Sequence, residues 1–197
     1  MTFKSAFYRI WNYIKFKRQG VILGKNSDIK YTVYLKKAPN SEIIIGDNFG
    51  FYSDCAINPL SRNLRGCIST NEGAKIHIGN NVGMSAVTLR CRNSITIGDR
   101  VTIGADALLT DSDGHSLDYR KRGSKQDIPV SKPIVIEEDA LIGTKTIILK
   151  GVTIGARSVI GSGSIVTKSI PADCIAAGNP CRVIRKIENW DDIHRGG

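Results

Sequence analysis

An aliphatic residue recurs at every sixth position through the C-terminal half of this 197-residue chain. The series is Ile136, Ile142, Ile148, Ile154, Ile160 and Val166. Neither the 3.6-residue period of an α-helix nor the two-residue period of a hairpin strand produces this spacing. A buried aliphatic every sixth residue, with Gly, Asn or Asp beside it to take the turn conformations, predicts short strands that meet at the corners of a solenoid.

The same period continues upstream with slips. Units of the form Ile-Gly-x-x begin at residues 45, 78, 97 and 103. The chain has 28 Ile against 10 Leu, together with 20 Gly, which favours strands and turns over helices. A set of unrelated β-hairpins with Gly turns would not place aliphatic residues at a constant six-residue spacing. We therefore expect an all-β repeat domain over residues 41–187, preceded by a cap at 1–40 and followed by a tail at 188–197.

The repeat is interrupted between Leu109 and Ile136, where 27 residues separate the two aliphatic positions, four hexapeptides plus three. This interval opens with the sequence TDSDGHSLD and continues with polar and charged residues. A solenoid interrupts its stacking where a loop has another use. We therefore expect an excursion loop over residues 110–135 and a functional site on it.

Two segments resemble a known family. The stretch 136–187, which ends in AGNPCRVIRKI, and the loop sequence DGHSLD are similar to the hexapeptide-repeat acyltransferases. The similarity is greatest to the sugar O-acetyltransferases grouped with galactoside, maltose and serine acetyltransferases, and it covers residues 41–187. It implies a left-handed parallel β-helix with three hexapeptides per coil, a homotrimer, and acetyl-CoA bound in the groove between neighbouring subunits.

The resemblance also implies a catalytic histidine at His115. Acetyl transfer from a thioester to a sugar hydroxyl requires a base for the hydroxyl proton, and a neutral imidazole suits this role near pH 7. Asp111 or Asp113 would orient the ring, and the sequence does not choose between them. The Ser85 hydroxyl or a backbone N–H would donate to the developing oxyanion. Galactoside-type members have Asn at the position of Ser85.

For acetyl-CoA, the resemblance carries over one group of residues along the pantetheine arm and a second group at the nucleotide phosphates. The first group is Gly143, Thr144, Ser162, Thr167 and Lys168, and the second is Arg182 and Arg185. The alternative for the two arginines is a solvated basic strip. Leu141 and Lys150 depart from the Trp and Pro that are common in the family.

The N-terminal segment predicts one amphipathic helix. Its apolar residues Phe3, Phe7, Ile10, Trp11 and Ile14 fall on one face. Such a helix either caps the open end of the solenoid or, through residues 1–20, rests on anionic lipid near a lipid-linked sugar.

The charge distribution and the residue types exclude several classes of protein. Of the net charge of +10, +8 lies in residues 1–37, unlike the spread basic surface of a nucleic-acid-binding protein. Five cysteines without a CxxC pair disfavour a disulfide framework. Together with the lack of an evident signal peptide, they predict a cytoplasmic chain. If residues 1–20 bind lipid, they bind at the inner membrane surface. The scattered residues His77, His115 and His194 do not match a zinc carbonic anhydrase, so no metal is expected.

We expect a cytoplasmic, acetyl-CoA-dependent sugar O-acetyltransferase whose acceptor is a sugar or a nucleotide- or lipid-linked sugar of surface polysaccharide synthesis. Serine O-acetylation and amino-sugar N-acetylation remain open alternatives. A third is a scaffold solenoid without activity, against which the DGHSLD loop argues.

Overall fold

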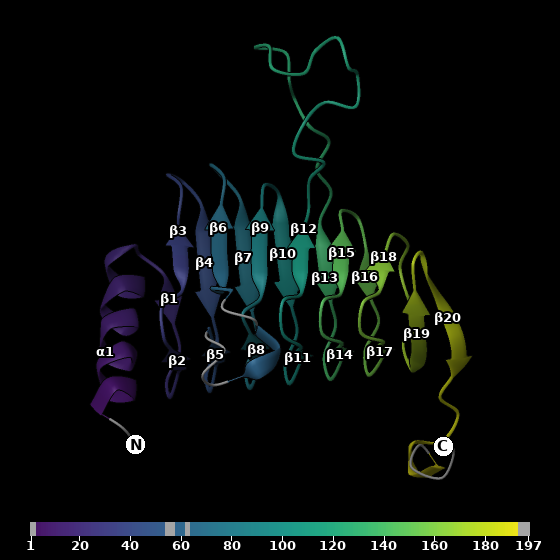
Figure 1. Cartoon of the computed structure of the whole chain (residues 1–197), viewed down its shortest axis with the longest axis horizontal. Coiled ribbons are helices and arrows are strands. Elements are labelled where there is room, and N and C mark those ends of the chain that lie inside the picture. The colour runs from purple at the N-terminus through teal and green to yellow at the C-terminus, as the bar shows by residue number, and fades with distance from the viewer. Residues whose placement is uncertain (1–2, 54–57, 62–63, 193–197) are drawn as a thin grey trace.

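The computed structural model describes residues 3–53, 58–61 and 64–192. Its strands form three sheets that run along the long axis of the molecule (Figure 1), and all strand pairs in them are parallel except β19 with β20. Sheet A contains β1 (Ile22–Leu23), β4 (Glu42–Ile45), β7 (Lys75–Ile78), β10 (Ser94–Ile97), β13 (Ile134–Ile136) and β16 (Thr153–Ile154). Sheet B contains β2 (Asp28–Lys30), β5 (Gly50–Tyr52), β8 (Gly83–Ser85), β11 (Thr102–Ile103), β14 (Leu141–Ile142), β17 (Val159–Ile160), β19 (Cys174–Gly178) and β20 (Cys181–Lys186). Sheet C contains β3 (Tyr34–Lys36), β6 (Cys67–Thr70), β9 (Thr88–Cys91), β12 (Leu108–Thr110), β15 (Ile147–Leu149) and β18 (Ile165–Val166).

The six-residue column forms the core. Ile136 pairs with Ile154, Ile142 with Ile160, and Ile148 with Val166. Each pair is 18 residues apart, so three hexapeptides complete one coil. All six side chains are at most 1% exposed. The predicted aliphatic column is therefore confirmed as the stacked interior of a parallel β-helix.

We expected Gly, Asn or Asp beside each buried isoleucine to take the turn conformations. Asn48 and Asp106 do have left-handed backbone, whereas the glycine directly after the isoleucine does not. A Cβ on Gly104 would lie 2.6 Å from the backbone nitrogen of Thr144 in the next coil. Glycine is required there because the next coil passes too close for a side chain.

The coils begin earlier than the expected domain boundary at residue 41. β1, β2 and β3 already form a first coil over residues 22–36. The unit Leu23-Gly24-Lys25-Asn26 is a repeat in which Leu replaces Ile, and Leu23 is buried. The cap therefore consists of the predicted helix, α1 (Phe3–Arg18), which lies across the open end of the solenoid (Figure 1).

Two connections leave the regular coils. The first joins β5 to β6 and includes a 3₁₀ turn at Pro59–Ser61. The second, the excursion, joins β12 to β13 over residues 111–133 and projects beyond the carboxyl edge of sheet C (Figure 1). It occupies the predicted loop, 110–135. At the far end of the solenoid, β20 returns antiparallel to β19, and a 3₁₀ turn follows at Trp190–Asp192.

Candidate active site

The stem of the excursion is a short antiparallel ladder. Ser112 bridges Ser131, the Asp113 amide donates to the Val130 carbonyl at 3.1 Å, and the Lys132 amide donates to the Asp111 carbonyl at 2.9 Å. These bonds pair backbone groups that leave the coil and would otherwise lack partners. The loop beyond them is thus held at its base.

His115 lies in this loop and is oriented by Asp127. His115 Nδ1 and Asp127 Oδ2 are 2.8 Å apart. The same carboxylate accepts hydrogen bonds from the Ser116 amide at 2.6 Å and the Gly123 amide at 2.8 Å. Gly123 has a φ of +76°, which a residue without a Cβ adopts at little cost. The loop therefore folds around Asp127.

These contacts determine which ring nitrogen of His115 carries the proton. The Gly123 and Ser116 amides, and then the His115 side chain, hold the pKa of Asp127 well below its ordinary range. An ionised carboxylate only accepts, so Nδ1 of His115 carries a proton and donates it. In the neutral ring, Nε2 then has a free lone pair. His115 is 73% exposed, so this lone pair is available to a reactant.

The two aspartates expected to orient His115 do something else. Asp111 is fully buried and accepts the Arg92 and Asn93 amides, both at 2.7 Å, which ties the stem to the preceding corner of the solenoid. Asp113 pairs with Lys150. The expectation for Asp111 and Asp113 is therefore corrected to Asp127, which sequence spacing did not indicate because the loop must double back across twelve residues to bring it to the ring.

Lys150 has a structural explanation. It follows β15, one coil beyond the excursion, where its ammonium binds Oδ1 of Asp113. Its side chain is 26% exposed and that of Asp113 is 18% exposed. This part-buried ion pair fastens the stem to the next coil, a contact that proline cannot make.

Most of the remaining candidate residues lie along two edges of sheet C. Gly143, Thr144 and Ser162 lie in turns between sheets B and C, and the Gly163 amide donates to the Thr144 carbonyl at 2.8 Å. Ser85 ends β8 at this same edge. The excursion leaves from the other edge, where Thr167 and Lys168 follow β18.

Arg182 and Arg185 are exposed on β20, opposite Ala177 and Ile175 of β19. Like Ser85, Thr144 and Ser162, they do not lie on the strand edge from which the excursion carrying His115 leaves. The fold therefore distributes the predicted cofactor residues over two edges of sheet C and the outer face of sheet B.

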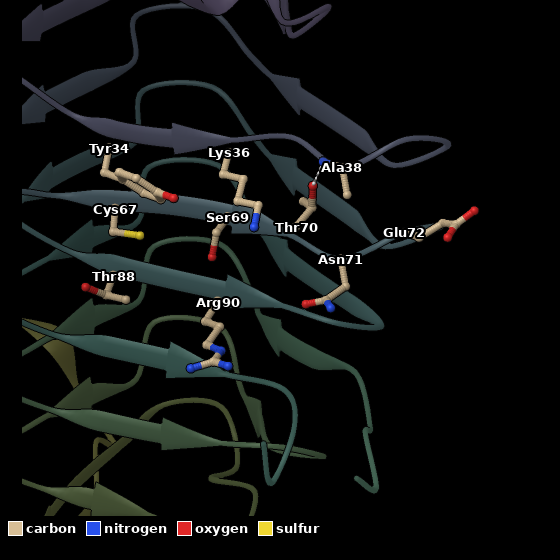
Figure 2. Close-up of a pocket in the computed structure, with 10 residues that line it drawn as sticks. All are labelled: Tyr34, Lys36, Ala38, Cys67, Ser69, Thr70, Asn71, Glu72, Thr88 and Arg90. Carbon is tan, nitrogen blue, oxygen red and sulfur yellow. Dashed lines mark hydrogen bonds between the residues drawn. The ribbon is translucent and has the colours of Figure 1, made fainter. Parts of the chain in front are cut away.

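A polar groove of about 470 Å³ lies on the outer face of sheet C, over β3, β6 and β9. Figure 2 shows its side chains in rows along these strands, with Lys36 and Arg90 among them. Lys36 is in register with Ser69, Ser69 with Arg90, and Arg90 with Thr110. Thr110 directly precedes the excursion, so this column leads along the sheet to the loop that carries His115.

Two basic residues, Lys36 and Arg90, and one acidic residue, Glu72, line the groove, which also has a half-buried thiol. Within the described residues neither Lys36 nor Arg90 forms an ion pair. Burial raises the pKa of the Cys67 thiol, which disfavours the thiolate needed for nucleophilic attack. The groove is thus suited to binding an anionic or hydroxyl-rich molecule.

The other histidines lie elsewhere. His77 is on the outer face of sheet A, with Nε2 2.6 Å from Oε1 of Glu42. This contact lowers the pKa of Glu42. His194 lies outside the described residues. No cluster of three or more His, Cys, Asp or Glu suited to a metal ion occurs in the described part of the chain.

A protein-family model and a named acetyltransferase each match part of this chain. Residues 133–168 match the model of the bacterial transferase hexapeptide, six repeats. Over 120 residues the chain is 44% identical to a galactoside O-acetyltransferase of Escherichia coli strain K12. The matched stretch is 60% of this chain and 58% of that protein. The chain thus spans somewhat over half the length of this relative.

Two solved structures resemble this protein over most of the length of its chain. A hexapeptide-repeat acetyltransferase from Vibrio cholerae is 28% identical, with a TM-score of 0.60 over 92% of this chain and 82% of that chain. A galactoside acetyltransferase in complex with coenzyme A is 26% identical, with a TM-score of 0.53 over 98% and 86%. The expected left-handed parallel β-helix is confirmed.

Proposed function

Because the chain is a hexapeptide-repeat protein that resembles the bacterial hexapeptide transferases, we propose that it transfers an acetyl group from acetyl-CoA to a sugar hydroxyl, with His115 as general base. The observation that carries this proposal is the contact between His115 Nδ1 and the ionised Asp127. It leaves Nε2 as a proton acceptor on an exposed loop, which is the group that acetyl transfer to a hydroxyl requires.

The proposed reaction needs no covalent enzyme intermediate. The acceptor hydroxyl loses its proton to Nε2 of His115 as its oxygen bonds to the thioester carbonyl carbon. The carbon–sulfur bond then breaks, and the imidazolium returns the proton to the departing sulfur. Ser85, or a backbone N–H, would donate to the oxyanion.

We assign the acetyl-CoA site to two chains of a homotrimer. Gly143, Thr144 and Ser162 lie on the edge of sheet C opposite the excursion. A second copy that presents this edge to the excursion would complete the site. Thr167 and Lys168 would line the pantetheine arm, and Arg182 and Arg185 would bind phosphate oxygens.

The groove is the proposed acceptor site. Lys36 and Arg90 favour an acceptor with an anionic group, such as the phosphate of a nucleotide- or lipid-linked sugar. This chemistry fits surface polysaccharide synthesis, where sugars are carried on phosphates before they are joined.

The experiment is acetyl transfer from acetyl-CoA to nucleotide-linked sugars, detected by mass spectrometry and thiol release. His115→Ala should lower kcat by about 10²- to 10⁴-fold while acetyl-CoA binding persists. Sedimentation should show a trimer, and mixed trimers of His115→Ala with a cofactor-site variant should regain part of the activity. A folded His115→Ala variant with full turnover would refute the base.

A further inference from the structure

The N-terminal helix caps the solenoid with its polar side. Asn12 is fully buried, and its Nδ2 donates to the carbonyls of Ile29 at 3.1 Å and Tyr31 at 2.6 Å. Nζ of Lys15 donates to the Val33 carbonyl at 2.6 Å, and Nε2 of Gln19 donates to the Leu35 carbonyl at 3.1 Å. No coil precedes the first coil to donate hydrogen bonds to its carbonyls, so these side chains act as the donors.

The apolar side of α1 consequently faces away from the protein. Phe7 is 54% exposed, Ile10 62%, Trp11 52% and Ile14 42%. They share one helix face, and the rings of Phe7 and Trp11 stack with centroids 6.3 Å apart. An amphipathic helix that caps a fold ordinarily buries this stripe. Here the only fully buried large apolar side chain among the described helix residues is Phe16.

The charge around this face has one sign. The helix sequence has no acidic residue and ends in Lys15, Lys17 and Arg18. Lys17 and Arg18 are exposed. An exposed apolar stripe edged by basic residues matches a bilayer interface with anionic headgroups, whereas a second copy would bring two such basic edges together.

We propose that α1 is an interfacial membrane anchor, whose apolar face binds the surface of an anionic bilayer. The helix lies across the end of the solenoid, so this face can lie parallel to a bilayer without a clash from the coils (Figure 1). No helix in the described ranges is long and apolar enough to cross a membrane, so the contact is peripheral. In a cytoplasmic chain it places the protein on the inner membrane surface.

On the proposed function, membrane binding by α1 also brings the groove close to the bilayer. β3, with Tyr34 and Lys36 of the groove, belongs to the coil next to α1. β12 lies three strands further along sheet C, which is about 14 Å at the usual strand spacing. A lipid-linked sugar phosphate could therefore enter the groove from the bilayer and extend toward the excursion.

The test measures binding of the full chain to sedimenting vesicles of phosphatidylglycerol and phosphatidylcholine, compared with phosphatidylcholine alone. The wild type should bind the anionic vesicles more tightly. Ile10→Ser should lower the partition coefficient by about 10-fold and Arg18→Gln by about 5-fold. Leu60→Ser is the matched control, since Leu60 is 58% exposed and remote in sequence from the helix. It should leave binding unchanged.

A second measurement locates the contact. In the Trp190→Phe background, the remaining Trp11 should shift its fluorescence to shorter wavelength when anionic vesicles are added. Absence of wild-type binding, or equal binding by Ile10→Ser and Leu60→Ser variants with unchanged thermal unfolding, would overturn the proposal. So would vesicle-independent self-association that Ile10→Ser abolishes. Vesicle binding is measured without turnover, so an inactive but membrane-bound chain would refute only the proposed function.

Discussion

Asp127 contacts His115 from within the fold of the excursion, with Oδ2 2.8 Å from Nδ1 of the ring. The carboxylate is only 11% exposed, whereas the imidazole is 73% exposed. Two backbone amides also donate to Asp127, so it is held before any reactant arrives. The loop would thus supply the proposed base already oriented, at low reorganisation cost, and both the fold of the loop and the proposed chemistry would depend on the same carboxylate.

Asp127→Asn should lower kcat by about 10²- to 10⁴-fold, because the amide can present N–H to Nδ1 and favour the wrong tautomer. The KM for acetyl-CoA should change little, since Asp127 positions His115 and does not line the proposed cofactor edges. Steady-state kinetics with both substrates checks this. Asp118→Asn is the control, because Asp118 lies in the same loop and pairs with solvent-exposed Arg120. Equal kinetics for the two variants would refute the positioning role.

The loop should lose order in acid. The pKa of folded Asp127 is lowered from its ordinary value of 3.8, so its contribution to stability is fully present above about pH 4 and is lost as the pH falls below that value. Hydrogen exchange should show protected Ser116 and Gly123 amides at pH 7. Asp127→Asn should remove this protection at pH 7, where trypsin should also cut after Arg122 faster. Unchanged protection in the variant would contradict the assignment.

Lys150→Ala should loosen the stem. Removing the ammonium leaves the part-buried Asp113 carboxylate unpaired, at a cost of about 1 to 3 kcal/mol. We expect kcat to fall more than acetyl-CoA affinity, because the stem supports His115. Lys150→Arg should restore most of the loss. If Lys150→Ala and wild type have the same unfolding free energy and kcat, the ion pair has no such role.

Gly104→Ala should destabilise the β-helix. Its Cβ would lie 2.6 Å from the Thr144 nitrogen, so adjacent coils must separate. We expect the free energy of unfolding to fall by about 1 to 3 kcal/mol, measured by urea denaturation. Gly83→Ala is the matched control, because nothing lies within 4 Å of a Cβ there. Similar changes in unfolding free energy for both variants would refute the role of the coil contact at Gly104.

Arg182→Ala and Arg185→Ala should raise the KM for acetyl-CoA by about 10- to 150-fold if each arginine binds a phosphate. The acceptor KM should stay nearly constant, and a CoA fragment without the 3′-phosphate should show a smaller effect. Isothermal titration with CoA gives an independent reading. Wild-type affinities in both variants would return these exposed arginines to a solvated basic strip.

Much of the fold was predictable because it rests on a local rule. The column from Ile136 to Val166 repeats every six residues, and each position meets its equivalent 18 residues later. The break after Leu109 likewise located the excursion. The first coil was missed because only Leu23-Gly24-Lys25-Asn26 carries a recognisable unit within it.

Three features depend on contacts between distant residues. Asp127 reaches His115 because the loop folds back on itself, and no spacing encodes that turn. Helix periodicity found the apolar face of α1 but not its direction, which is decided by the carbonyls of the first coil that Asn12 pairs. The column of Lys36, Ser69 and Arg90 exists because residues 33 and 21 positions apart stack in register. The sequence by itself determined the six-residue period and the excursion, because both follow from local turn and burial preferences. Only the tertiary structure decided which polar groups meet, because unequal insertions between coils set the register of the stacked strands.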